Sequence, residues 1–278
     1  MGLKNMPTDT RRITGPEESV SPLAYVAASE VQECIVSAEG LRKDRRKCED
    51  LRKIFIKTGV VSQARGSAYI EQNETKIICA VYGPREVAKK EEFSMKGQIT
   101  CDFKYATFSC KYRRQHQQDH EEKDLSVQLV EALEPAVCLH KFPKAQVNIY
   151  VEVLQNDGSA LAASITCASM ALSDAGIEVY DLVIGCSMKI YEDKVLTDPT
   201  NDEENDHKGE SCLNNSSITV GYMPSLNQIS AVTSSGEIQI DFLKKAMTDC
   251  VQACQKIYPA MQQTLHRTVR HKLTANER

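Results

Sequence analysis

The sequence predicts a mixed α/β fold of the α+β class, on two observations. From residue 54 onward, alternating apolar residues typical of strands are separated by stretches with helical periodicity. The order of strands followed by a helix also occurs roughly twice, which suggests two similar halves. We therefore expect one folded domain over about residues 54–272, preceded by an N-terminal arm over 1–53 and followed by a C-terminal tail over 273–278.

Composition agrees with a globular chain. Of the 278 residues, 41% are hydrophobic and 26% are charged, which is ordinary for a folded protein. The net charge of −4 indicates no dominant polyanion-binding surface, although local basic patches are compatible with it. Apolar runs are far shorter than the ~20 residues that span a bilayer, so neither a membrane span nor a secretory signal is expected. The eleven cysteines are odd in number and dispersed, which favours reduced, mostly buried thiols.

The first 53 residues differ in pattern from the rest of the chain. They combine Pro7, Gly15, Pro16 and Pro22 with a charged run over 42–53. This pattern indicates an extended arm that would lie across neighbours in an assembly, and a disordered tail is the alternative.

The first half of the domain begins with strands. Residues 54–61, 68–70 and 75–81 are rich in apolar and β-branched side chains, which predicts three of them. A charged loop over 85–96 separates them from an alternating strand over 98–108.

Two helices with different surfaces follow. Apolar residues recur at helical spacing from about Glu122, and Pro135 is expected to kink or end this helix. After a strand over 147–153, residues 159–175 are almost all small or apolar, with Gly176 placed as a C-terminal cap. Small side chains on most faces predict that this second helix is packed closely on both sides.

The second half is expected to mix strands with a final helix. Strands are predicted over 180–190, 217–222 and 228–233, with a polar, acidic loop over 198–215 between the first two. The stretch 241–271 carries a buried stripe at helical spacing and predicts a long C-terminal helix.

Motifs for common catalytic sites are absent, including phosphate-binding loops, nucleophile elbows and the zinc-protease motif. Two pairs of residues four apart could share a helix face: Cys250 with Cys254, and His116 with His120. The cysteines belong to an apolar stripe, so core packing is favoured for them. The histidines lie in a Gln-rich, charged stretch without a third ligand, so a solvated loop is favoured there.

Two features near the small-residue helix could carry chemistry. Asp157-Gly158-Ser159 lies at the start of the helix, where free N–H groups can hold a phosphate. A simple turn with a helix cap is a sufficient alternative and is slightly favoured. The acidic loop with Asp198 and Glu203-Glu204 offers carboxylates that could hold Mg²⁺, although a solvated loop is favoured for it.

A basic cluster is the third feature. Lys104, Lys111, Arg113 and Arg114 could contact a phosphate backbone, and the alternative is a basic loop without a ligand. The chain has 6 Phe and no Trp, and no aromatic–basic surface pattern is expected. The last point, with the net charge, argues against a module that binds RNA by itself.

Several segments, in order along the chain, resemble the RNase PH family. They cover about residues 54–260, and together they are specific to it. The segments are Gly66-Ser67-Ala68-Tyr69-Ile70, 75–85, Phe142-Pro143-Lys144, Asp157-Gly158-Ser159, 171–176 and Leu196-Thr197-Asp198-Pro199-Thr200. Three further segments, 11–19, 133–137 and 180–186, resemble ring subunits of the eukaryotic RNA exosome.

The resemblance implies an RNase PH-like fold, of the ribosomal protein S5 domain 2-like type, with duplicated βαβα halves. It also implies a heterodimer with another RNase PH-type subunit within a six-membered exosome ring. Cap subunits of the S1/KH type and single-stranded RNA in the channel would be the further partners. The expected locations are the nucleus, including the nucleolus, and the cytoplasm.

Active members of the family hold the attacking phosphate with the Thr and Arg of an Asp-Gly-Gly-Thr-Arg segment. Here Ser159 follows Gly158, and those two positions are Ala160 and Leu161, so a hydroxyl donor and a charged fork are lost. The family's two metal-side aspartates match Asp198 and Glu204, of which the second is a longer carboxylate.

The resemblance therefore implies a non-catalytic subunit with no cofactor and no metal, whose five positions Ser159, Ala160, Leu161, Asp198 and Glu204 are relics. It also implies RNA contact near Arg113 and Arg114. An active phosphate-dependent 3′-to-5′ exoribonuclease is the alternative.

Overall fold

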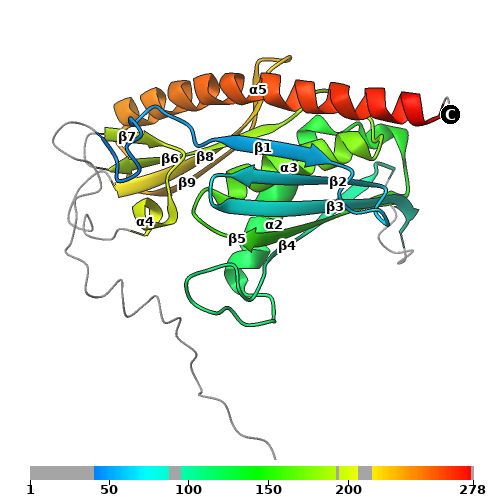
Figure 1. Ribbon diagram of the computed structural model, residues 1–278, viewed down its shortest axis with the longest axis horizontal. Helices are drawn as coiled ribbons and strands as arrows, with labels where there is room; N and C mark the ends of the chain where they lie inside the picture. Colours follow the sequence, from blue (N-terminus) through cyan, green and yellow to red (C-terminus); the bar gives the residue numbers. More distant parts are fainter. Residues whose placement is uncertain (1–40, 88–94, 192–193, 206–214, 277–278) are drawn as a thin grey trace, which may run out of the picture.

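The structure is a computed structural model that describes residues 41–87, 95–191, 194–205 and 215–276. Two sheets and the helices between and beside them form the domain (Figure 1). This arrangement confirms the mixed α/β fold. The predicted arm lies outside the described residues over 1–40.

The larger sheet has the strand order β1-β2-β3-β5-β4. All neighbours in it are antiparallel except β4 and β5, which run parallel. The strands are β1 (Ile54–Thr58), β2 (Gly66–Gln72), β3 (Thr75–Glu86), β4 (Gln98–Tyr105) and β5 (Ala145–Gln155). In β3 and β5 buried residues alternate with more exposed ones, as expected for a sheet with one face on the core.

The smaller sheet is antiparallel throughout, with the order β7-β6-β8-β9. Its strands are β6 (Ile184–Tyr191), β7 (Lys194–Thr197), β8 (Asn215–Met223) and β9 (Gln228–Gly236). Seven of the eight residues of β6 are buried, because helices cover both of its faces.

Helix α3 (Ala160–Asp174) is the small-residue helix, and it lies between the two sheets. A Cβ atom on Gly66 of β2 would lie 2.2 Å from the Ala175 nitrogen, and one on Gly185 of β6 would lie 2.2 Å from the Ala162 oxygen. The helix backbone therefore approaches a strand on each side closely, which confirms the prediction drawn from its composition.

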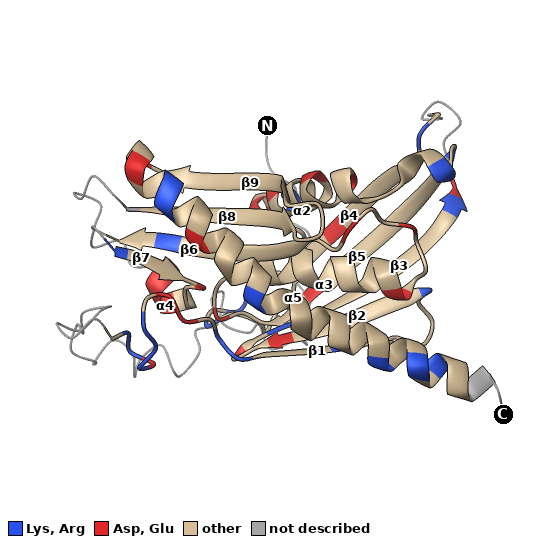
Figure 2. Ribbon diagram, turned by 90° about the horizontal axis from the view of Figure 1, so that it is seen from above, with Lys and Arg blue, Asp and Glu red and all other residues tan. Residues whose placement is uncertain are grey.

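Two other long helices pack on the sheets. α2 (His120–Leu133) begins two residues before Glu122, because Asp119 and Glu122 form a reciprocal capping box, and a short 3₁₀ turn containing Pro135 follows it. α5 (Ile240–Asn276) covers the smaller sheet and reaches β1, and it continues through Pro259 (Figure 2). Cys250 and Cys254 are fully buried in its packed face, as predicted. No described helix is both long and apolar enough to cross a membrane.

The structure departs from the prediction in three places. The predicted loop over 198–215 contains the helix α4 (Asn201–Glu204), whose first turn is stabilised by a capping box between Thr200 and Glu203, and β7 lies just before it. β6 begins at residue 184 rather than 180, because the Asp181 carboxylate accepts hydrogen bonds from the backbone of Ser225 and Leu226 and holds a loop instead.

Residues 41–53 are the third departure, because they pack on the domain instead of extending from it. Arg42 and Arg52 are both buried. Arg42 lies 3.6 Å from the Glu203 carboxylate, and the backbone N–H of Thr197 donates to the Cys48 carbonyl at 2.8 Å. This part of the predicted arm is therefore joined to β7 and α4.

Candidate functional site at the start of α3

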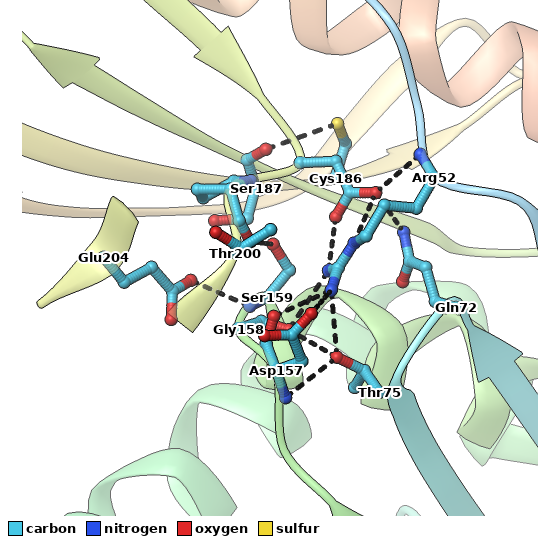
Figure 3. Close-up of polar contacts among 12 residues, drawn as sticks. Arg52, Gln72, Thr75, Asp157, Gly158, Ser159, Cys186, Ser187, Thr200 and Glu204 are labelled. Carbon is cyan, nitrogen blue, oxygen red and sulfur yellow. Dashed lines mark hydrogen bonds and ion pairs between the residues drawn. The ribbon is translucent and has the colours of Figure 1, made fainter. Parts of the chain in front are cut away.

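The site is built around the turn Asp157-Gly158-Ser159, which connects β5 to α3. Gly158 and Ser159 have φ values of +85° and +55°. A Cβ atom on Gly158 would lie 2.6 Å from the Pro199 oxygen, so only glycine fits this backbone path. The Ser159 hydroxyl donates to the same Pro199 carbonyl at 3.1 Å, which joins the turn to the segment before α4 (Figure 3).

On one side of the turn, Arg52 and Asp198 form a buried ion pair. The guanidinium donates to Asp198 from Nη2 at 2.6 Å and from Nε at 3.0 Å. The Arg52 backbone N–H and the Gln72 side-chain amide donate to the same carboxylate, at 3.0 and 2.9 Å. Four donors therefore occupy the two oxygens of Asp198.

The remaining donors of Arg52 hold the turn itself. Nη1 donates to the Asp157 carbonyl at 2.8 Å and to the Thr75 hydroxyl at 3.0 Å, and Nη2 donates to the Gly158 carbonyl at 3.1 Å (Figure 3). Burial alone would raise the pKa of Asp198, but the hydrogen bonds and charge of Arg52 outweigh it and lower that pKa. Asp198 is therefore a structural carboxylate in this arrangement.

On the other side of the turn lies a cavity of about 480 Å³. Ser159, Ala160, Leu161 and Glu204, four of the five expected relic positions, line it. Glu204 lines the cavity and Asp198 does not, because the Asp198 carboxylate is bound by Arg52 on the other side of the turn. The other lining residues are mainly hydroxyl, amide and charged side chains: Tyr105, Glu121, Leu125, Gln128, Ala162, Ser187, Lys189, Asn205, Ser217, Thr219, Thr233 and Ser235.

Glu204 extends its carboxylate to the N-terminal end of α3. Its Oε1 accepts the Ser159 backbone N–H at 2.8 Å. Burial raises the pKa of Glu204 to about 7, because the Ser159 N–H and the more distant Arg52 offset only part of the desolvation. A carboxylate of the protein itself therefore accepts the hydrogen bond of an N–H at the start of this helix.

The basic cluster lies in and beside the loop between β4 and α2, and its members have different environments. Arg114 pairs with Glu121 at 3.1 Å, Lys111 pairs with Asp202, and Arg113 is exposed. The expectation of no aromatic–basic surface pattern is wrong for this loop, because its Phe and Tyr side chains are exposed between these cations.

No candidate metal site is present in the part of the chain that the structure describes. No group of three or more His, Cys, Asp or Glu side chains there could hold a metal ion. His120 begins α2 and is exposed, as is His116 in the preceding loop, so the pair is solvated as favoured above.

Several residues of the site were not identified from the sequence. Arg52, Gln72 and Thr75 hold the turn and Asp198, and Lys189 lines the cavity. The charged run over 42–53 is the one available signal for Arg52, and its composition predicts an arm instead of a site. No spacing rule connects residues that are more than a hundred positions apart.

Comparison with known proteins agrees with this architecture. The 3′ exoribonuclease family model matches residues 50–178 with its domain 1 and 181–253 with its domain 2. The chain is 39% identical to the "Exosome complex component MTR3" of Homo sapiens, over 96% of this chain and 98% of that protein. It is 32% identical to the "Exosome complex component Rrp41" of Cenarchaeum symbiosum, over 83% of this chain and 93% of that one.

Solved structures show the same fold. Rice Rrp46 superposes with a TM-score of 0.70 at 24% identity, covering 81% of this chain and 100% of that one. A chain of an Archaeoglobus fulgidus exosome, described as having RNA bound to the active site, gives a TM-score of 0.68 at 20% identity over 80% of this chain and 93% of that one. With both domain models matched in order, this chain belongs to the 3′ exoribonuclease (RNase PH) family.

Proposed function

We propose that this chain is a non-catalytic structural subunit of the six-membered RNase PH-type ring of the RNA exosome. In that role it supports 3′-to-5′ RNA processing and degradation and lines part of the RNA channel. The observation that carries the loss of catalysis is the Glu204 carboxylate on the Ser159 N–H. The 39% identity to an exosome component over nearly the whole chain supports the place in the ring.

Electrostatics support the absence of phosphorolysis. The ionisable acidic and basic side chains that line the cavity include Glu121, Glu204 and Lys189, so a phosphate would enter beside two acidic side chains and one ammonium. Ala160 and Leu161 add no donor side chain to compensate. Because each lost preorganised contact costs on the order of 10²–10³ in rate, turnover would be negligible.

An RNA phosphorolysis assay tests the catalytic part. Purified chain would receive Mg²⁺, inorganic phosphate and 5′-labelled single-stranded RNA, with an active archaeal relative assayed in parallel. We expect no nucleoside diphosphates and no shortening ladder. Phosphate-dependent products from the wild-type chain would identify an active exoribonuclease and contradict the proposal.

The double variant Ala160→Thr/Leu161→Arg asks whether these two positions are sufficient for activity. We expect it to remain inactive while Glu204 is present, because the carboxylate still occupies the helix N-terminus. Adding Glu204→Asp, which restores the shorter carboxylate, is the more informative third change. Activity in the double variant alone would show that Glu204 is not inhibitory.

Assembly tests the structural part. The full chain, co-expressed with other RNase PH-type exosome subunits, should co-purify as a heterodimer and within a ring, and the ring should accept S1/KH-type cap subunits. A tagged copy should be found in the nucleus, including the nucleolus, and in the cytoplasm. Failure to associate with any RNase PH-type subunit would contradict the proposal.

A further inference from the structure

The loop between β4 and α2, residues 106–119, combines exposed aromatic rings with a local excess of positive charge. Phe108 is 72% exposed and Tyr112 is 63% exposed. No acidic residue occurs between Asp102 and Asp119, in a chain whose net charge is −4. The loop therefore offers both exposed rings and cations, which a ligand with flat faces and negative charge could contact.

The loop is held in place rather than hanging freely. The Arg114 backbone N–H donates to the Thr107 carbonyl at 3.1 Å, which closes the loop at its base. The Asn156 backbone N–H donates to the Ser109 carbonyl at 2.9 Å, which fastens the loop to the residue before the Asp157-Gly158-Ser159 turn. The loop, whose backbone runs between β4 and α2 in Figure 1, is therefore ordered before binding, which lowers the conformational cost of contacting a ligand through the two rings.

Three of the four cations in this region have partners within the protein. The Lys104 ammonium donates to the His116 carbonyl oxygen. Lys111 forms an ion pair with Asp202, and Arg114 forms one with Glu121. The Arg114 guanidinium also lies 4.2 Å from the centre of the Tyr105 ring. Arg113 is exposed, and no partner is seen for its guanidinium among the residues that the structure describes.

We infer that Phe108 and Tyr112 stack on bases of single-stranded RNA while Arg113 contacts its phosphates. This inference rests on the function proposed above and assigns the RNA contact to particular side chains. Every base offers a π face, so two exposed rings can bind RNA of any sequence, and an unpaired guanidinium suits a phosphate. Lys104, Lys111 and Arg114 instead order the loop.

RNA is favoured over a protein partner by the charge of the loop. Its exposed rings alternate with cations and not with carboxylates, which matches a polyanion. Tyr105 and Glu121, which contact Arg114, also line the cavity, so the loop stands at the rim of the same site. RNA that passes this rim would meet both rings.

The test measures binding of labelled single-stranded RNA to the full chain, both alone and assembled with its RNase PH-type partners. An abasic oligonucleotide of the same length is the second probe. Phe108→Ala/Tyr112→Ala should weaken binding of the normal oligonucleotide on the order of tenfold for each ring and leave the abasic one unchanged. Arg113→Ala should weaken both probes and reduce the salt slope by about 0.7.

Phe55→Ala is the matched control, because Phe55 is 55% exposed on β1, outside the loop. It should change neither affinity. Equal binding of both oligonucleotides by wild type and double variant would overturn the stacking, even if Arg113→Ala weakened both. Loss of ring assembly in the double variant, with RNA affinity intact, would overturn it in favour of a protein contact.

The two proposals can fail separately. If the wild-type chain did not assemble with RNase PH-type subunits, the proposed function would fail, while the comparison of normal and abasic oligonucleotides would still test the rings on the chain alone. If assembly succeeded and the rings made no difference, only the stacking would fail.

Discussion

Asp198 and Glu204 lie on opposite sides of one turn, and their pKa values are shifted in opposite directions. Asp198 accepts four hydrogen bonds, three of them from Arg52, and its pKa is lowered. Glu204 accepts one backbone N–H beside a cavity, and burial raises its pKa to about 7. Both carboxylates lose water, so the difference shows what a buried guanidinium contributes.

This contrast distinguishes a structural ion pair, Arg52 with Asp198, from a degenerate site, the cavity at the start of α3. The Arg52 side chain links the segment before β1 to β3, to the turn and to the residue that follows β7, so it joins both family domains. On the cavity side no arginine lies among the described lining residues: Lys189 is the cation there, and Ala160 and Leu161 carry no polar side-chain atom. The fold can therefore keep the Arg52–Asp198 ion pair on one side of the turn while the cavity on the other side loses its phosphate-binding side chains.

Removing the Arg52–Asp198 ion pair should have the largest effect on stability. Arg52→Met leaves Asp198 buried without its cation, which should lower the free energy of unfolding by about 3–5 kcal/mol. Chemical denaturation at pH 7 with circular dichroism would measure the change. A loss below about 1 kcal/mol would contradict the view that this pair holds the two domains together.

Lys111→Met is the matched control for that variant. Its ion pair with Asp202 is mostly exposed to solvent on both sides. Removing it should change the free energy of unfolding by about 0–1 kcal/mol, because water and salt screen the pair.

A substitution in the Asp157-Gly158-Ser159 turn should have the second-largest effect on stability. Gly158→Ala must tolerate a φ of +85° and place a Cβ atom 2.6 Å from the Pro199 oxygen. Strain and overlap together should lower the free energy of unfolding by about 2–4 kcal/mol. Thermal and urea denaturation of the same preparation would measure it.

Gly176→Ala isolates the backbone strain from the overlap. Gly176 has a φ of +70°, but a Cβ atom there would meet nothing within 4 Å. Its cost should be about 1 kcal/mol. Equal losses in the two variants would mean that the contact between the turn and Pro199 contributes nothing.

The sequence predicted local features well. The small-residue helix, the strands around it and the buried stripe of α5 were all evident from periodicity and composition, because each pattern lies within one segment. α4 was missed because four residues are too short for a periodic signal, and only the Thr200–Glu203 capping box marks it.

The site was harder to predict because it depends on long-range contacts. The resemblance singled out Ser159, Ala160, Leu161 and Glu204, and these four residues line one cavity, while their status as relics of a catalytic site stays a prediction. It also paired Asp198 with Glu204, whereas Arg52, distant in the sequence, binds Asp198 on the other side of the turn. A buried ion pair between distant segments has no signature in either segment alone.

Of the three test variants, apart from their controls, Glu204→Gln should have the smallest effect, and it should act in the opposite direction to Arg52→Met. With a pKa of about 7 in the folded state and an ordinary value of 4.5, Glu204 takes up a proton from solvent on folding between those pH values. Wild-type stability therefore gains from this group as pH falls from about 7 toward 4.5, and above pH 7 the buried charge is a constant cost. Glutamine removes that cost and keeps an oxygen for the Ser159 N–H. At pH 8 we expect a gain of about 1–2 kcal/mol, reduced from the full shift because the residue is only partly buried.

The pH dependence separates this explanation from a general effect on packing. Urea denaturation of Glu204→Gln and wild type at pH 8, 6 and 4.5 should give a difference that disappears at the lowest pH. Glu121→Gln is the control, because Glu121 lines the same cavity with a more exposed side chain. A loss of stability in Glu204→Gln that is equal at all three pH values would show that the carboxylate stabilises the start of α3. The contrast with Asp198 would then rest on geometry alone, because both carboxylates would be stabilising anions with different partners.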